Sequence, residues 1–218
     1  MSDPATSCVF DLDHYAELLA CAREGGYRFA DFGDGPEPGD LFLRHDVDLS
    51  LDAAVRMAEV EAAAGVTAWY FLMRDSVFYN LGSDEGSATI ARLRKLGHRL
   101  GCHLVFPDTQ LDERLGPVVA WHNPDPEYMS AELEDGINVM SARYFSPGTY
   151  RSDSNQRWRH GCPHEELRRG AFPWLQLLTH PEIWVYEGET MGQTMRSMLQ
   201  AEKERRLEQL RADRIDLS

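Results

Sequence analysis

The pattern of hydrophobic and polar positions predicts strands that alternate with helices over most of the chain. The expected strands are short apolar runs rich in β-branched and aromatic residues, at 41–48, 66–73, 98–106, 117–121, 138–145, 174–180 and, as a weaker candidate, 182–186. The expected helices carry apolar residues at helical spacing; their caps are Asp13, Ser50 and Ser87, and their C-terminal glycines are Gly25-Gly26, Gly65 and Gly97. This alternation predicts a mostly parallel sheet with right-handed crossovers, in which active sites gather at the carboxyl ends of the strands.

The last part of the chain has a different pattern. Residues 189–213 are helical in spacing and highly charged, with one apolar side formed by Met195, Met198, Leu199, Leu207 and Leu210. Such a helix is more typical of docking or dimerisation than of catalysis. We therefore expect an α/β domain over 1–188 and a C-terminal amphipathic helix and tail over 189–218, through which the chain can form a homo-oligomer.

Composition and charge narrow the range of partners. The 218 residues carry a formal net charge of −14, from 22 basic and 36 acidic side chains. This charge repels phosphate backbones, so we expect no nucleic-acid partner and favour a neutral or cationic small molecule. No apolar run reaches the roughly 20 residues that span a bilayer, and the polar segment 1–6 lacks the basic start and apolar run of a secretory signal. These features predict no membrane association and a cytoplasmic location.

The cysteines lie far apart in the sequence, without a C-x-x-C pair: Cys8, Cys21, Cys102 and Cys162. This spacing favours reduced, mostly buried thiols over a disulfide framework or a structural zinc site. The segment Cys162-Pro163-His164 holds two metal-binding side chains, but two alone do not make a site. The chain also lacks the glycine-rich and G-x-S-x-G motifs of nucleotide-binding proteins and serine hydrolases.

The segment His45-Asp46-Val47-Asp48 is the most informative motif. In a strand, Asp46 and Asp48 lie two residues apart and face the same side. Two ionised carboxylates this close repel each other, and a divalent ion on one of them relieves the repulsion and leaves the other free to act as a base. A structural interpretation fits the tetrapeptide equally well: Asp48 caps the following helix, and Asp46 pairs with Arg44 or with solvent.

Histidines at the ends of later strands favour the metal interpretation. His103 ends the third expected strand, His122 follows the next strand, and His180 follows a late one. Mixed histidine and carboxylate ligation with an open water position is how catalytic zinc sites are built. Four further histidines lie in expected helices or turns and are interpreted as surface or capping residues: His14, His98, His160 and His164.

Five segments, in this order, resemble a divergent branch of the polysaccharide deacetylase (NodB-homology) family of carbohydrate esterases: LFLRHDVDLSLDAAVRMAEVEAAAGVTAWYF, LGHRLGCHLVF, WHNPDP, YRSDSNQRW and LQLLTHPEIW. The resemblance covers about residues 10–186. The first segment is quite specific, whereas the short histidine segments carry weight mainly through their order. The resemblance implies an α/β fold of the distorted, incomplete (β/α) barrel type and hydrolysis of N-acetyl or O-acetyl groups on sugars.

The resemblance also implies roles for individual residues. Asp46 matches the catalytic base, while Asp48 and His103 match ligands of a divalent metal ion, with zinc the first choice and cobalt or nickel the alternatives. His180 matches the residue that protonates the leaving group, and Asp153 matches an aspartate that orients such a histidine. The implied activity is that of a metal-dependent carbohydrate deacetylase, a hydrolase acting on an acylated amino sugar in polysaccharide biosynthesis.

The chain departs from the family pattern at the third metal ligand. The family's second metal histidine would lie four residues after His103, where this chain has Pro107. His122 is the first candidate to replace it, and Asp108 is the second. The segment between His103 and His122 is also too short for the helix normally found there. Two alternatives therefore stay open: a deformylase or other small-amide hydrolase on the same metal site, and a degenerate, non-catalytic member that binds a glycan or a partner protein.

Overall fold

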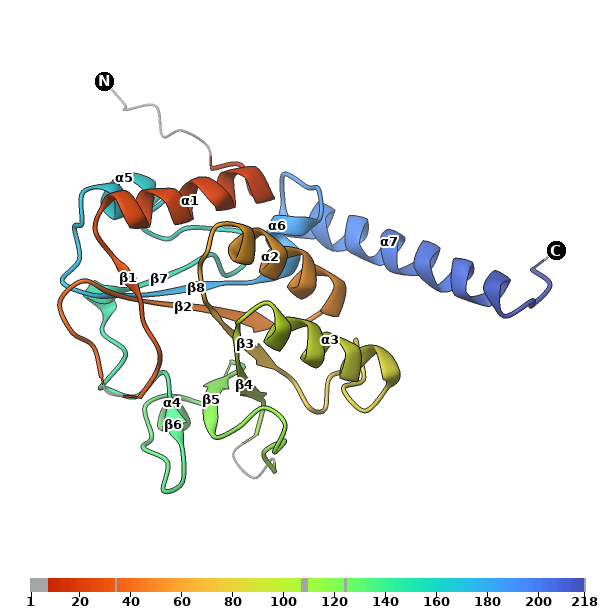
Figure 1. Cartoon of the computed structure of the whole chain (residues 1–218), viewed down its shortest axis with the longest axis horizontal. Coiled ribbons are helices and arrows are strands. Elements are labelled where there is room, and N and C mark those ends of the chain that lie inside the picture. The colour runs from red at the N-terminus through yellow and green to blue at the C-terminus, as the bar shows by residue number, and fades with distance from the viewer. Residues whose placement is uncertain (1–7, 34, 107–109, 124, 218) are drawn as a thin grey trace.

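The computed structural model describes residues 8–33, 35–106, 110–123 and 125–217, and its strands form one curled parallel sheet (Figure 1). The strands are β1 (Arg28–Phe29), β2 (Asp40–Val47), β3 (Trp69–Leu72), β4 (Arg99–Leu104), β5 (Val118–Trp121), β6 (Ile137–Asn138), β7 (Tyr150–Ser152) and β8 (Leu175–Thr179). Their order is β6-β5-β4-β3-β2-β8-β7, and β1 pairs with the start of β2. Every pairing between described strands is parallel, so the α/β class with a half-barrel sheet is confirmed.

Helices pack mainly on one face of this sheet, as Figure 1 shows. They are α1 (Leu12–Glu24), α2 (Leu51–Ala63), α3 (Asp84–Lys95), α5 (His164–Arg168) and α6 (Pro181–Val185). The short helix α4 (Pro126–Met129) and the 3₁₀ turn η1 (Pro147–Thr149) lie in the connections between β5 and β7. The helix α7 (Met191–Ala212) ends the chain and projects away from the sheet (Figure 1).

The side chains of β2 divide between two packing layers. Leu41, Leu43 and Val47 belong to the main core between the sheet and the helices. Phe42 belongs to a second apolar cluster on the opposite face, which we call the inner face. Because side chains alternate along a strand, the even-numbered residues of β2 also point to the inner face. The fold thus places Asp46 beside this second cluster, away from the helices.

The predicted helices are present, but two of their caps differ. Asp11, not Asp13, caps α1, because its carboxylate accepts the His14 N–H at 2.7 Å. Ser83, not Ser87, caps α3 by accepting the Gly86 N–H. In both cases the true cap is the residue with extended backbone just before the first turn, which the polar pattern alone does not single out. Ser50 caps α2 as predicted.

Several predicted strands also differ from the structure. The segment 182–186 is the helix α6, and Pro181 at its first position suits a helix start rather than a strand. Only Ile137–Asn138 of the region around 138–145 pairs with the sheet, since the chain then turns. The strand β7 was not predicted; it is three residues long and is defined by its pairing with β8.

The C-terminal helix was predicted within two residues at each end. Its first half docks on the domain, where Met198 is buried against Ala53 and Tyr186. Farther along, Arg205 forms an ion pair with Glu85 of α3. Among the described helices, none is both long and apolar enough to cross a membrane. Assembly into a homo-oligomer through α7 stays a prediction.

Candidate metal centre

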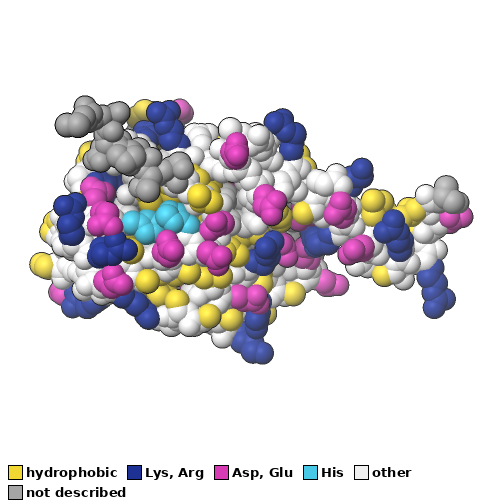
Figure 2. Space-filling view, turned by 90° about the horizontal axis from the view of Figure 1, so that it is seen from above, with side chains coloured by type: hydrophobic (Ala, Val, Ile, Leu, Met, Phe, Trp, Pro, Cys, Tyr) yellow, Lys and Arg dark blue, Asp and Glu magenta, His cyan; other side chains and the backbone are white. Residues whose placement is uncertain are grey.

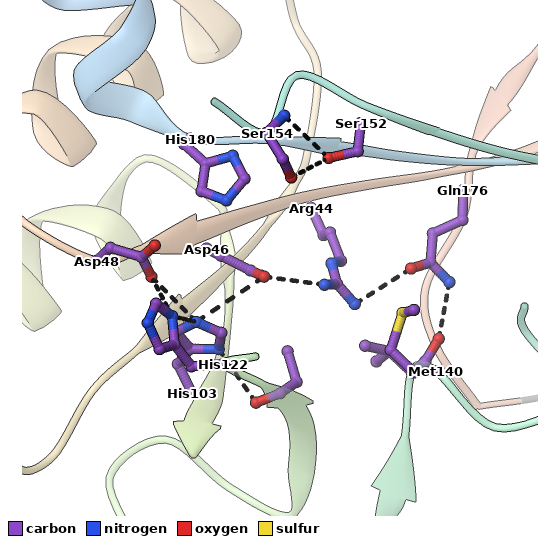
Figure 3. Close-up of polar contacts among 12 residues, drawn as sticks. Arg44, Asp46, Asp48, His103, His122, Met140, Ser152, Ser154, Gln176 and His180 are labelled. Carbon is purple, nitrogen blue, oxygen red and sulfur yellow. Dashed lines mark hydrogen bonds and ion pairs between the residues drawn. The ribbon is translucent and has the colours of Figure 1, made fainter. Parts of the chain in front are cut away.

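Three of the predicted ligands converge at the edge of the sheet where the parallel strands have their carboxyl ends. Asp48 follows β2, His103 lies in β4, and His122 follows β5 (Figure 3). Asp48 Oδ1 lies 3.0 Å from His103 Nε2 and 3.3 Å from His122 Nδ1, and the two nitrogens are 3.2 Å apart. The three atoms form a nearly equilateral triangle that could hold a metal ion.

The dimensions of this triangle fit a tetrahedral metal ion. Bonds of about 2.0–2.1 Å from zinc to nitrogen or oxygen place two ligands about 3.3 Å apart. Although the contacts at Asp48 Oδ1 are short, this buried atom has no partner in hydrogen-bond geometry among the described residues. His103 Nδ1 lies 3.1 Å from the Ala120 carbonyl oxygen, and a hydrogen donated there leaves the Nε2 lone pair directed at the centre. These residues therefore fit a divalent cation.

The electrostatics keep Asp48 in its ligand form. Burial alone would raise the pKa of Asp48, but the imidazoles of His103 and His122 outweigh it and hold the pKa well below the ordinary range. The pKa of His122 is raised, chiefly by its interaction with Asp48. The carboxylate therefore needs a positive charge at this point, either protons on the imidazoles or a metal ion in their place.

Asp46 lies beside the three ligand atoms, and one of its two carboxylate oxygens accepts a hydrogen bond. Its Oδ2 accepts a hydrogen bond from Arg44 Nη2 at 2.9 Å, and Arg44 Nη1 donates to Gln176 Oε1 at 3.2 Å. Its Oδ1 is buried and has no hydrogen-bond partner among the described residues. The structural interpretation of the motif is thus half right: Asp46 does pair with Arg44, but Ser50 and not Asp48 caps the following helix.

His180 is held in a fixed orientation by Asp153. Asp153 Oδ1 lies 2.6 Å from His180 Nδ1, and Asp153 Oδ2 accepts hydrogen bonds from the His180 backbone N–H and from Trp184 Nε1. Burial would lower the pKa of His180, but the charge and hydrogen bond of Asp153 raise it to about 10. A pKa raised in this way favours the imidazolium form of His180 at neutral pH.

One cavity joins all of these groups. It has a volume of about 640 Å³, and its walls include Asp46, Asp48, His103, His122 and His180. Figure 3 shows His180 across the site from the two imidazoles, with the two aspartates between them. Aromatic and basic side chains complete the walls: Trp121, Phe145, Tyr150, Arg151 and Arg159. A cavity of this size accommodates a small organic molecule.

Two buried acidic residues were not among the site residues predicted from the sequence. Glu182 lines the same cavity, and burial raises its pKa to about 8. Glu61 lies on the helix side of the sheet, where it accepts hydrogen bonds from Tyr15 and Tyr70 and lies 2.6 Å from His45 Nε2. The signal for Glu61 was its position on the apolar side of α2, where a carboxylate requires buried partners.

The other residues that were singled out in the sequence lie outside the metal centre or outside the described residues. His98 is buried and contacts the Ala58 carbonyl oxygen, so its interpretation as a surface or capping residue was wrong. Asp108, the second candidate for the third ligand, lies outside the described residues, as does Pro107. All four cysteines are free thiols; Cys21 and Cys102 are buried, and the other two are half-buried.

Comparison of the chain with protein-family models, curated proteins and solved structures finds no match. The interpretation of these residues as a metal centre therefore rests on their geometry. Fold and site together define an α/β protein with a curled parallel sheet and a candidate mononuclear metal centre at the carboxyl ends of its strands.

Proposed function

We propose that the chain is a metal-dependent hydrolase that removes an acyl group, with N-acetyl the first choice, from an amino sugar or a sugar-containing biosynthetic intermediate. The observation that carries this proposal is the presence, in one cavity, of a triangle of metal ligands, an unpartnered carboxylate oxygen and an oriented imidazolium. These are the parts that amide hydrolysis needs: an activated water, a base and an acid. The resemblance to polysaccharide deacetylases supports the sugar as substrate.

Each residue then has a defined task. A divalent ion held by Asp48, His103 and His122 would acidify a water molecule and polarise the acyl oxygen. Asp46 accepts the proton of the attacking water on Oδ1, while Arg44 fixes the carboxylate through its other oxygen.

The second proton transfer belongs to the opposite side of the cavity. His180 donates a proton to the departing amine, because an amide anion is too poor a leaving group to depart unprotonated. Asp153 acts as a positioning residue, since it holds the imidazole through Nδ1 and leaves Nε2 for the substrate.

Metal content of the purified protein tests the site directly. Relative to wild type, Asp48→Asn, His103→Ala and His122→Ala should each lose about one ion per chain. His160→Ala is the matched control, because this histidine lines the cavity without belonging to the ligand group. Equal metal content in all five proteins would refute the metal centre.

A substrate screen tests the reaction. Acetylated and formylated amino sugars should be compared side by side with the metal-loaded protein, and Asp46→Asn should abolish turnover while the metal stays bound. Faster release of formate than of acetate would support the deformylase alternative. Metal binding without turnover of any acylated sugar would favour the non-catalytic, glycan- or partner-binding alternative.

A further inference from the structure

A second group of metal-binding side chains lies on the helix side of the sheet, away from the cavity. It comprises Cys8, just before α1; His14, in the first turn of α1; and Cys162 and His164, at the start of α5. Figure 2 shows histidine side chains gathered at the surface on this side of the molecule. We call these four residues the Cys-His cluster. The Cys-His cluster was not predicted from the sequence, because Cys8 and His14 are far from Cys162 and His164 in the chain.

The distances within the Cys-His cluster suit a metal ion. Cys8 Sγ and Cys162 Sγ lie 3.1 and 3.5 Å from His14 Nε2. Zinc bonds of about 2.3 Å to sulfur and 2.0–2.1 Å to nitrogen place the two kinds of ligand about 3.6 Å apart. Cys8, His14 and Cys162 offer three ligand atoms that all lie within 4.8 Å of one another. Convergence of two thiols on one imidazole nitrogen exceeds the single hydrogen bond that this nitrogen can make.

His164 and Glu17 complete the arrangement. His164 Nδ1 lies 2.7 Å from Cys162 Sγ, and its ring lies against the His14 ring with centroids 4.0 Å apart. The other ring nitrogen of His164 is buried without a hydrogen-bond partner among the described residues. Glu17 Oε2 lies 3.3 Å from His14 Nδ1. A carboxylate that accepts from one nitrogen of a histidine and directs the other at a metal is the usual support of a zinc ligand.

We propose that Cys8, His14 and Cys162, with His164 as the fourth ligand, form a second metal site that binds zinc and joins the segment before α1 to the start of α5. Thiolate and imidazole donors favour zinc over hard cations such as magnesium. Four protein ligands leave no open position, so the site is structural rather than catalytic.

The proposed zinc site is also linked to the cavity, through Trp158 and the two residues that follow it. The indole N–H of Trp158 donates to Cys8 Sγ at 3.2 Å. Trp158 precedes Arg159 and His160, which line the cavity wall. A metal ion bound to Cys8 and Cys162 therefore joins residues 8–11, just before α1, to the part of the chain that follows this wall.

Cobalt substitution tests the proposal without relying on enzyme activity. Cobalt(II) bound by cysteine gives a thiolate-to-metal charge-transfer absorption, whereas the centre at Asp48 contains no sulfur. The band should appear in wild type and in His103→Ala, and disappear in Cys8→Ser and Cys162→Ser. Cys21→Ser is the matched control, because Cys21 is a buried thiol of α1 outside the cluster.

Metal counting and thiol titration complete the test. Wild type should hold about two ions per chain, and both His103→Ala and Cys8→Ser should hold about one. Zinc removal should lower the melting temperature of His103→Ala, whereas the double variant His103→Ala/Cys8→Ser, which lacks both sites, should show no such response. Absence of the charge-transfer band in wild type would overturn the proposal. So would a Cys8–Cys162 disulfide in protein purified without reductant, detected as two fewer titratable thiols than after reduction.

Discussion

Replacing Asp153 with asparagine tests whether this carboxylate holds His180 as an imidazolium. Asp153 is fully buried and accepts hydrogen bonds from the His180 and Trp184 N–H groups as well as from the His180 ring. Asparagine keeps one acceptor oxygen but places an N–H group against His180 Nδ1. The ring nitrogen must then accept a hydrogen bond, so the imidazole loses its positive charge and keeps its hydrogen on Nε2.

The pKa of His180 sets the magnitude of the effect. Burial opposes protonation, but Asp153, with further contributions from the charges of Asp48 and Glu182, raises the pKa from 6.5 to about 10, so the full shift is an upper bound on the effect of Asp153. A pKa that is raised on folding stabilises the fold fully below the unfolded value, and this contribution is lost as the pH rises through the folded value. At 1.36 kcal/mol per unit, the shift corresponds to about 5 kcal/mol well below pH 6.5 and about 4 kcal/mol at pH 7. This is a large part of the roughly 5–15 kcal/mol that stabilises a typical domain.

Urea unfolding of chelator-treated protein between about pH 6 and pH 10.5 measures this contribution. The difference in unfolding free energy between wild type and Asp153→Asn should be largest at the acid end and should shrink as the pH approaches 10. Asp112→Asn serves as control, because Asp112 pairs with Arg114 and not with a histidine. A difference that does not change with pH, or a His180 proton resonance that titrates near 6.5 in wild type, would refute the reasoning.

Three further substitutions probe the scaffold, each by denaturant unfolding. Glu61→Gln places an amide among buried hydroxyl and imidazole donors and should cost about 3–5 kcal/mol; a loss below about 1 kcal/mol would show that Glu61 is not ionised in the fold. Gly101→Ala, two residues from His103, adds a methyl group that overlaps the Phe71 ring and the Val118 carbonyl oxygen; it should cost about 1–3 kcal/mol, and unchanged stability would contradict the close packing. Tyr79→Phe removes a hydroxyl that joins the end of β2 to the end of β3 through two backbone hydrogen bonds; a loss of about 1–3 kcal/mol is expected, and unchanged stability would contradict this role.

Sequence periodicity was sufficient to predict the arrangement of strands and helices, but not the short elements. The long helix 189–213 and the buried strand 41–48 were predicted almost to their true ends, because the helix has a sustained hydrophobic period and the strand is an apolar run with a clear start. The strand β7 is too short to show a period, and α6 begins at a proline after a strand-like apolar run. Pairing with distant neighbours decides such segments, and pairing is not visible in a local pattern.

The candidate site followed from the same logic where strand ends could be located. Asp48, His103 and His122 lie at the carboxyl ends of β2, β4 and β5, which share one edge of a parallel sheet with β3 between the first two, so their convergence at this edge was predictable. The Cys-His cluster was not predictable in this way. Its residues come from the segment before α1 and from the start of α5, and only the docking of these two helices brings them together.

Buried polar atoms without a hydrogen-bond partner mark the places where the fold does not satisfy its own polar groups. Such an atom costs about 1–3 kcal/mol, so a stable fold keeps few of them, and those that persist tend to mark functional sites. Among the described residues, the buried side-chain atoms without a hydrogen-bond partner belong to Arg44, Asp46, Asp48, Trp121, His164, Glu182 and Arg205. All but two of these residues line the one cavity, and His164 belongs to the Cys-His cluster. The polar groups left unsatisfied are therefore concentrated where a substrate or a metal ion can satisfy them, and Arg205 on α7 is the single exception in this set.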